Sequence, residues 1–528
     1  MNNFRYYLAA LGAVAAVHAV QAFSLIGPFD PGQVADIGYD VGLRTFTQQG
    51  DLGGPRNIGD EYRWSSPIIT YGFDASFLDY FGTNGVIAVT KAIQIFNALP
   101  NASKMSAGLH EYPLRTSGVN FAAQRLHLYD IKSFTLSILC EQLGLAAPER
   151  YVWTLKTRYP LPGNQNIFLT INRNYDPVSQ IYSPFVNGTR YSFAIGTYTL
   201  PDGTVYYDTR KVAIDAAEPN ITVASLHGIQ AGAAAVDDRV ERTMGFRRSA
   251  TEGQPSASGG AFGLYFSGLT RDDVGGIRYL IDPRNKNYES APTGSTAQNS
   301  SGATVISSSS AGASSGGSGG SSAGTVWTVI DGVNNAGTAT GGGTTGGTTG
   351  TTNVVTLPFT NEALRSGVDK ITFIRVDLDP ITRRNSRPMV VQYNETITTN
   401  GVSVTQRVQR ALIQPDILFS AADIGDSQFS PFVYNRTLTF SDPTRSDPGV
   451  VNNPNNTLAY PGNINGNVDV TFSAIGPYYT GGDVGSHQGN NGFGFLWGSF
   501  DGTTNRPVVF PEGRVDLLEL ERAALNDN

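Results

Sequence analysis

The sequence predicts two folded parts, an α+β part followed by a mostly β part, joined by a low-complexity segment. Residues 291–352 are nearly all Ser, Gly, Thr and Ala. Such a segment lacks the apolar side chains needed to offset its chain entropy, so we expect a flexible linker there. Residues 23–290 mix helical and strand periodicity, whereas residues 353–528 contain mainly short alternating runs separated by turn residues.

The first 22 residues have the pattern of a secretory signal peptide. Arg5 precedes an apolar run, and Val20-Gln21-Ala22 has the compact residues of a cleavage site. The pattern predicts a mature chain that begins at Phe23 and is secreted, periplasmic or held at the cell surface. The apolar run is shorter than the roughly 20 residues that span a bilayer, and no second such stretch exists, so we expect no transmembrane segment.

The net charge and the single cysteine limit the kinds of partner and of cross-link that this chain can have. The formal net charge is −7 at pH 7, which argues against nucleic acid or an anionic membrane as the main partner because both require a basic face. Cys140 is the single cysteine, so no disulfide can form within the chain. We therefore expect an exported protein that is stabilised by its hydrophobic cores.

The elements of the first part alternate in type along the chain. We expect helices over residues 84–99, 130–145 and 270–281, and strands over 67–73, 151–155, 167–171 and 196–200. Thr270 is placed to cap the last helix, and Asp272 and Asp273 would complement the dipole in its first turn. This order of elements is typical of an α+β or α/β fold.

The second part is almost entirely strand-like. We expect strands over residues 370–378, 389–393, 402–408, 411–413, 432–434 and 468–472, with turn signals such as Asn400-Gly401 between them. Many short strands favour a sandwich or a barrel. An amphipathic helix over 515–525 would cover this β part, and an apolar island at 326–330 inside the linker could dock on a neighbour as a strand.

Three segments of the first part resemble a known family. They are Ile68-Ile69-Thr70-Tyr71-Gly72-Phe73-Asp74 with the helix end at 95–100, the tripeptide Leu143-Gly144-Leu145, and the helix Leu269-Thr270-Arg271-Asp272-Asp273-Val274-Gly275-Gly276-Ile277-Arg278-Tyr279-Leu280. In this order they are similar to the matrixin-like branch of the metzincin zinc peptidases. The resemblance implies an α+β metzincin-like scaffold over residues 68–280.

The zinc motif of that family is absent. Metzincins use H-E-x-x-H-x-x-G-x-x-H, in which three histidines bind Zn²⁺ and the glutamate activates water. With Gly144 placed at the motif glycine, the three histidine positions hold Ser137, Glu141 and Ala147, and the glutamate position holds Ile138. The resemblance therefore implies the scaffold without its metal, cofactor or catalytic residues.

Other candidate sites are weaker. The histidines beyond the leader are His110, His127, His227 and His487, and no two of them have the spacing of metal ligands on a helix. The one combination that could bind a metal ion is His127 with Cys140 and Glu141. Cys140 reads as a small buried hydrophobe. The aspartate pairs, which favour turns over calcium sites, are Asp377 with Asp379, Asp423 with Asp426, and Asp442 with Asp447. Gly312-Ala313-Ser314-Ser315-Gly316 lies in the linker and reads as a chance match to a nucleophile elbow.

Two aromatic stretches lie in the second part, at residues 476–479 and 493–500. Either they form a platform for sugar rings or a protein partner, or they are strands with a core face; the period-two spacing of Phe493, Phe495 and Trp497 favours a strand. The ligand or partner, protein or carbohydrate, stays open.

The whole chain also resembles secreted proteins of Verrucomicrobia-type environmental bacteria. The similar segments are Phe23-Ser24-Leu25-Ile26-Gly27-Pro28-Phe29, Glu61-Tyr62-Arg63-Trp64, the helix with Asp272-Asp273-Val274-Gly275-Gly276, and residues 495–502. That resemblance implies no activity. The leading hypothesis is a secreted, non-catalytic binding or structural protein on a metzincin-like scaffold without the zinc site. The alternatives are a secreted hydrolase, such as a peptidase, with an atypical site, and a self-assembling cell-surface protein.

Overall fold

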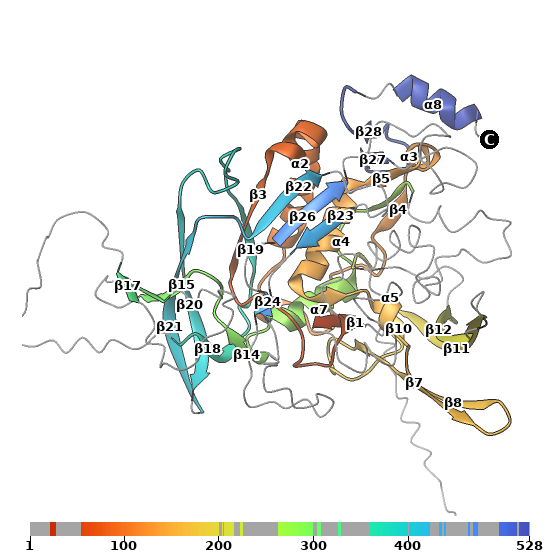
Figure 1. Ribbon diagram of the computed structural model, residues 1–528, viewed down its shortest axis with the longest axis horizontal. Helices are drawn as coiled ribbons and strands as arrows, with labels where there is room; N and C mark the ends of the chain where they lie inside the picture. The colour runs from red at the N-terminus through yellow and green to blue at the C-terminus, as the bar shows by residue number, and fades with distance from the viewer. Residues whose placement is uncertain are drawn as a thin grey trace, which may run out of the picture.

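The fold is that of a computed structural model of the whole chain. The residues that it describes are 22–27, 54–199, 203, 205–215, 222–224, 262–298, 304–307, 326–328, 360–399, 401–422, 432–435, 438–439, 463–464, 468–473, 496–514 and 517–526. Within these residues the protein is mixed and rich in strands, which form several sheets (Figure 1).

A five-stranded sheet forms the centre of the molecule (Figure 1). Its strands, in spatial order, are β19 (Thr372–Arg375), β3 (Ile68–Phe73), β22 (Ile417–Ala422), β26 (Val468–Ser473) and β23 (Phe432–Asn435). The first four are parallel and β23 is antiparallel to β26. β3 is buried along nearly its whole length, as is usual for a strand inside a parallel sheet.

This sheet joins the two parts that the sequence analysis separated. β3 belongs to residues 23–290, yet it lies between β19 and β22, which belong to residues 353–528. A second junction pairs β27 (Leu496–Ser499) with β5 (Leu128–Asp130) in parallel. The predicted linker at 291–352 therefore does not separate two independent sheets. We expected residues 353–528 to form a sandwich or barrel of their own, but several of their strands pair with strands of the first part.

The main hydrophobic core is shared in the same way. α2 (Ala75–Asn97) begins at Asp74, whose carboxylate accepts the N–H of Phe77, and it packs on the central sheet. Its Phe77 and Phe81 rings meet Phe472 of β26 at centroid distances of 6.1 and 5.7 Å. Trp497 of β27 is fully buried and lies 5.2 Å from the ring of Phe472. The burial of Trp497 in β27 confirms a strand with a core face over the described part of the stretch at 493–500, whereas Phe493 and Phe495 lie outside the described residues.

A seven-stranded antiparallel sheet flanks the central sheet and contains the long β20–β21 hairpin (Figure 1). Its order is β14 (Lys286–Ser290), β18 (Glu362–Ser366), β20 (Met389–Thr399), β21 (Val402–Leu412), β15 (Ser295–Gln298), β16 (Thr304–Ser307) and β17 (Val326–Thr328). The last three strands lie within the predicted linker. Residues 326–328 of the predicted island form β17, which pairs with β16, and β15 pairs with β21. Part of the Ser/Gly/Thr-rich segment therefore forms strands, because backbone pairing needs no apolar side chain.

Smaller elements surround the core. The helices are α3 (Phe121–Arg125), α4 (Ile131–Leu143), α5 (Pro148–Tyr151), α7 (Arg271–Ile281), α8 (Leu517–Asn526) and the 3₁₀ turn η1 (Ala102–Lys104). The remaining strands are β1 (Phe23–Gly27), β2 (Gly54–Pro55), β4 (Ser117–Val119), β6 (Leu145–Ala146), β7 (Thr154–Leu161), β8 (Gln165–Ile171), β9 (Asn174–Tyr175), β10 (Phe185–Val186), β11 (Thr189–Thr199), β12 (Val205–Ala213), β13 (Leu264–Phe266), β24 (Leu438–Thr439), β25 (Asn463–Ile464) and β28 (Val508–Val509).

The C-terminal helix predicted over 515–525 is α8, and it covers a satellite cluster rather than a separate β part. Leu520 is fully buried there beside Leu128 and Leu496, which come from β5 and β27. None of the described helices is long and apolar enough to cross a membrane.

Candidate functional site

The helix that the resemblance assigns to zinc binding is α4. Asp130 caps its N-terminus by accepting the N–H of Ser133 at 3.0 Å, and Gly144 ends it in the left-handed conformation. Every residue of α4 except Lys132 is buried. The helix therefore crosses the interior of the molecule instead of lining an open surface.

The degenerate motif positions all lie in this interior. Ser137 and Ile138 are fully buried, Glu141 is 1 % exposed and Ala147 is 3 % exposed. Ile138 belongs to the main hydrophobic core, where an apolar side chain fills space and cannot exchange protons. The side chains at these positions are thus enclosed by the fold.

Gly144 is required by the close packing of the chain around it. A β-carbon at this position would lie 2.0 Å from the carbonyl oxygen of Tyr62, and the backbone φ of 114° disfavours any side chain. Its carbonyl accepts the N–H of Ile26 at 3.0 Å, which fixes β1 to the end of α4. The sequence analysis identified this glycine through a catalytic motif, and the structure gives it a packing role.

Cys140 and His127, which the sequence analysis considered as metal ligands, both lie in the described part of the chain. Cys140 is fully buried, and burial followed by the nearby Asp273 carboxylate raises the pKa of its thiol well above the usual value. A protonated, enclosed thiol is a poor nucleophile, so Cys140 is a buried hydrophobe. His127 has a φ of 52° and its ring lies 4.9 Å from that of Phe262. In the described part of the chain, no three His, Cys, Asp or Glu side chains are grouped so that they could hold a metal ion.

Of the remaining sequence candidates, some lie in the described part of the chain and others lie outside it. Asp379 accepts the N–H groups of Ile381 and Thr382 at 3.1 and 2.7 Å, which confirms a turn-forming aspartate. Outside the described residues lie His227, His487, Asp423, Asp426, Asp442, Asp447, the segment 312–316 and the aromatic stretch 476–479.

A group of buried carboxylates near α4 was missed as a group from the sequence. Glu149 of α5 and Asp272 and Asp273 of α7 are 2 %, 1 % and 2 % exposed. Burial raises the pKa of each of the three, that of Glu149 to about 7. The sequence analysis predicted that the two aspartates complement the helix dipole, which explains their position in the first turn of α7. It did not predict that they are buried, because the segments that cover them are distant in sequence.

These carboxylates hold backbone segments in place. Thr270 and Asp273 form a capping box, and Asp273 also accepts the N–H groups of Val223 and Ala224, each at 3.0 Å. Glu149 accepts the N–H of Thr222 at 2.7 Å and its hydroxyl at 3.0 Å. The described segment 222–224 is thus held to α5 and α7 by hydrogen bonds from its backbone N–H groups to these buried carboxyl groups.

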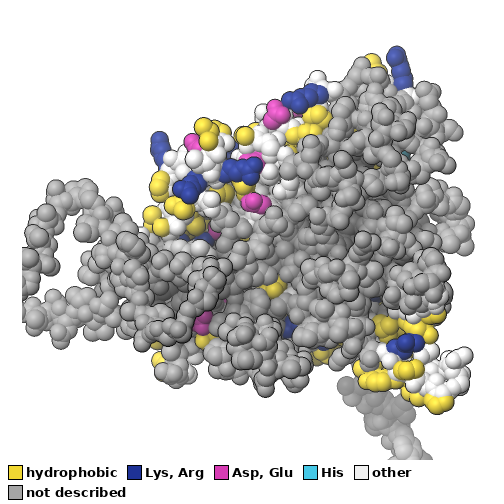
Figure 2. Space-filling view, in the orientation of Figure 1, with side chains coloured by type: hydrophobic (Ala, Val, Ile, Leu, Met, Phe, Trp, Pro, Cys, Tyr) yellow, Lys and Arg dark blue, Asp and Glu magenta, His cyan; other side chains and the backbone are white. Residues whose placement is uncertain are grey.

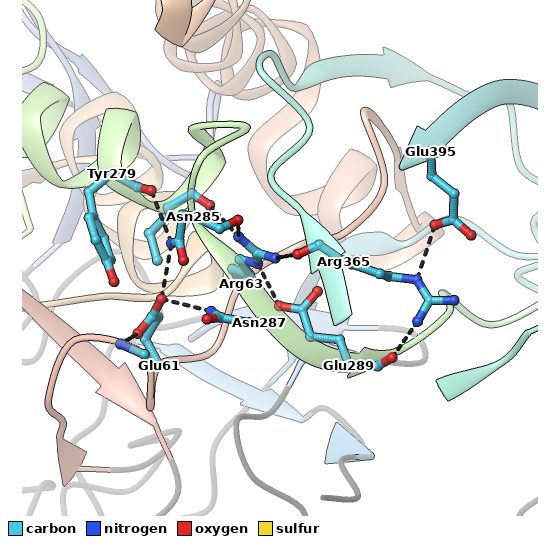
Figure 3. A network of polar contacts seen from close by, with 10 residues as sticks. Glu61, Arg63, Tyr279, Asn285, Asn287, Glu289, Arg365 and Glu395 are labelled. Atoms are coloured by element: carbon cyan, nitrogen blue, oxygen red, sulfur yellow. Dashed lines mark hydrogen bonds and ion pairs between the residues drawn. The ribbon is translucent and has the colours of Figure 1, made fainter. Parts of the chain in front are cut away.

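A second buried polar network lies between the central region and the seven-stranded sheet (Figure 3). Arg63 donates to Glu289 Oε1 at 2.5 Å, to the Asn285 carbonyl at 2.9 Å and to the Arg365 carbonyl at 2.7 Å. Arg365 in turn pairs with Glu395 at 3.1 Å. Both arginine side chains are 1 % exposed, so these contacts fix β14 and β18 to the segment that precedes β3.

Glu61 anchors the other end of this network (Figure 3). It is fully buried and accepts from the side-chain amides of Asn285 and Asn287 at 3.1 and 2.8 Å. The segment 61–64 therefore alternates two charged side chains with the buried Tyr62 and Trp64. The sequence analysis used this segment only for a resemblance of the whole chain. The alternation of charged and aromatic residues in it was the sequence signal for a buried polar network, and it was missed.

The surface carries an exposed apolar face on the β7–β8 hairpin, visible as yellow side chains near the lower right of Figure 2. Tyr159 and Ile167 are paired across the two strands and are 55 % and 52 % exposed. Leu161 and Leu169 extend the same face at 40 % and 42 %. On the opposite face, Phe168 packs 5.3 Å from Tyr207 of β12.

Comparisons with known proteins do not assign this site to a family. No family model, no curated protein and no solved structure matches the chain.

Proposed function

We propose that this chain is a secreted, non-catalytic binding or structural protein built on a metzincin-like scaffold without a zinc site. The observation that carries the proposal is the enclosure of α4. In the helix that would present metal ligands in a zinc peptidase, every residue except Lys132 is buried here, and Ile138 belongs to the main core. Catalytic zinc sites need three protein ligands and an open coordination position.

A binding role is supported by the surface of the β7–β8 hairpin. Contiguous exposed apolar side chains are uncommon on proteins that have no partner, and this hairpin places four of them on one face. Their aromatic and aliphatic character suits a protein or carbohydrate ligand better than a polyanion.

The experiment that tests the non-catalytic proposal is metal analysis of the full mature chain. The protein is produced with zinc in the medium, alongside the variants Glu141→Gln and, as a matched control in the same helix, Gln142→Glu. Glu141 is the motif position with a metal-binding side chain. We expect far less than one zinc per chain in all three proteins. Near-stoichiometric zinc that is lost in Glu141→Gln would overturn the proposal.

The alternative of a hydrolase with an atypical site is favoured by one observation, the pKa of about 7 at Glu149. A carboxylic acid that titrates near neutrality suits general acid–base catalysis. Both of its oxygens accept hydrogen bonds from Thr222, however, so a structural role accounts for the same side chain. Hydrolysis of a peptide or ester library that is abolished by Glu149→Gln, in a variant that still folds, would support this alternative instead.

A further inference from the structure

The alternation of side chains along β8 is the reverse of what a surface strand normally shows. Ile167 and Leu169 face solvent and are 52 % and 42 % exposed. Asn166 and Thr170 share the other, partly buried side of the strand with Phe168. A strand at a protein surface usually turns its apolar side chains to the core and its polar ones to water. The reversal puts apolar side chains where a partner can contact them.

The free edge of β8 has none of the features that usually prevent pairing with another chain. Within the described residues β8 pairs with β7 alone, and Figure 1 shows the hairpin projecting away from the central sheet. Gln165–Ile171 contains no charge, no proline and no glycine. β7, by contrast, contains Arg158 and Pro160 and has a bulge between Leu155 and Thr157. Charges, proline and bulges block edge pairing, so the hairpin is protected on its β7 side and open on its β8 side.

The backbone groups of β8 point alternately to β7 and to this open edge. Pro160 has no N–H, and it lies opposite Asn166. A proline fits a strand where the missing N–H would point away from the neighbouring strand, so Pro160 and Asn166 form a non-hydrogen-bonded pair. The N–H and C=O of Asn166 therefore point to the open edge, and two residues later so do those of Phe168.

We propose that β8 pairs antiparallel with β8 of a second copy of this chain, with Phe168 on the two-fold axis. This pairing rests on the binding role that we propose above for the hairpin. Phe168 exchanges backbone hydrogen bonds with the partner's Phe168. Ile167 faces the partner's Leu169, and Leu169 faces the partner's Ile167, with β-carbons about 4.5–5.5 Å apart. Since Phe168 is flanked by an apolar residue on each side, the same contact forms twice, as an isologous interface requires.

The assembly ends at two chains. Pairing uses the open edges of both copies and builds a four-stranded antiparallel sheet with a β7 strand on each outside, and β7 is the strand with the proline and the bulge. The larger sheet also stabilises the hairpin, because two strands alone are only marginally stable in water. Seven residues from each chain bury less than the roughly 800 Å² per partner of a standard interface, so the dimer is weak.

Sedimentation of the full mature chain tests the pairing. We expect a reversible monomer–dimer equilibrium in the micromolar range. The variant Ile167→Lys/Leu169→Lys should weaken it at least about tenfold, because each new lysine faces a lysine of the partner. The matched control is Val402→Lys/Val404→Lys on β21, whose valines have the same spacing and are 62 % and 40 % exposed, and it should dimerise like the wild type. A wild-type chain that stays monomeric, or a dimer that survives the β8 substitutions, would overturn the proposal.

Opposite charges test the register. The variant Ile167→Lys/Leu169→Glu places a lysine opposite a glutamate of the partner at both contacts. It should dimerise at least about tenfold more tightly than Ile167→Lys/Leu169→Lys, although both variants lose the same two apolar side chains. Equal dissociation constants for the two variants would show that these positions do not face each other.

Disulfide trapping covers the case in which the charged variants do not fold. A chain with Ile167→Cys mixed with a chain with Leu169→Cys should form a mixed dimer under mild oxidation, because directly opposed positions lie within reach of a disulfide. Either chain alone should cross-link at least about tenfold more slowly, because equivalent positions lie on the diagonal, about 7–8 Å apart. Cys140 is fully buried and does not compete. Equal rates in mixed and unmixed samples would contradict the register.

The proposed function and the self-pairing fail in different ways. Near-stoichiometric zinc that depends on Glu141 would overturn the proposed function and has no bearing on the state of β8. A chain that binds no zinc and stays monomeric in the sedimentation experiment would overturn the self-pairing alone, and the apolar face of the hairpin would then have a foreign ligand.

Discussion

At the scale of single residues, two positions that the sequence resemblance aligns with the zinc motif and its glycine have packing roles in this chain. Ile138 is part of the core, and Gly144 allows the backbone of Tyr62 to pass against the end of α4. The polar residues that matter in this region are instead Glu149, Asp272 and Asp273, which hold backbone N–H groups from distant segments. Their side chains stabilise one chain path, and this is where single substitutions should have the largest effects.

Gly144→Ala should destabilise the protein beyond the cost of its backbone conformation. The left-handed conformation alone costs about 1–2 kcal/mol for a non-glycine residue. The added β-carbon would also meet the Tyr62 carbonyl at 2.0 Å, so β1 or α4 must shift. Gly163→Ala is the matched control, because its φ is 82° and no atom lies near its β-carbon position. Urea unfolding that gives equal losses for the two variants would contradict the packing role.

Glu149→Gln should change how stability depends on pH. The folded pKa of about 7 exceeds the ordinary value of 4.5, so the protonated acid is the form that the fold favours. The associated stability is complete below about pH 4.5 and is lost as the pH rises to about 7. The wild-type free energy of unfolding should therefore fall over this interval, by up to about 3 kcal/mol from this residue. A smaller fall is expected in Glu149→Gln, whereas parallel curves from urea titrations would refute the assignment.

At the scale of elements, buried ion pairs hold strands of the seven-stranded sheet to the rest of the fold. Arg63 reaches Glu289 in β14 and the carbonyl of Arg365 in β18, and Arg365 continues to Glu395 in β20. Arg63 thus fixes the position of two strands at once. The sequence predicts elements well where the signal is local: Thr270, Asp272 and Asp273 indicate the start of α7, and the structure confirms the cap.

Arg63→Met should be strongly destabilising because it leaves Glu289 buried without its cation. Loss of one partner of a buried pair typically costs about 3–5 kcal/mol. The double variant Arg63→Met with Glu289→Met should recover part of that loss, since both charges are then removed. Arg284→Met removes a surface pair whose arginine is 91 % exposed, and it should have almost no effect in the same urea titration. A double variant less stable than the single one would argue against this account.

At the scale of the whole molecule, the two parts of the chain are interleaved. β3 lies between β19 and β22, and the aromatic core joins Phe77 and Phe81 to Phe472 and Trp497. Such a sheet cannot form from either part alone, because each part would expose unpaired strand edges and half of a core. Folding should therefore be cooperative across the low-complexity segment.

Cleavage at an engineered protease site between Ser314 and Ser315 should leave the two fragments associated. We expect them to co-elute in size-exclusion chromatography in native buffer and to separate only in denaturant. Residues 353–528 produced alone should lack a cooperative unfolding transition. Fragments that separate in native buffer, each with its own transition, would favour the two independent domains that the sequence predicts.

The sequence by itself determined the local features of this protein: the capped helix α7, the buried strand β3, the helix α8 and the absence of the zinc motif around Gly144. These depend on side-chain periodicity, capping residues and motif spacing, which lie within a short window of chain. Only the tertiary structure decided which strands are neighbours and which carboxylates are enclosed together. β3 pairs with β19 and β22, which are about 300 residues or more away along the chain. Backbone hydrogen bonds form in the same way for almost every residue type, so the sequence does not indicate which strands are neighbours. The Ser/Gly/Thr-rich segment therefore looks like a domain boundary in sequence, although the sheet and the core continue across it.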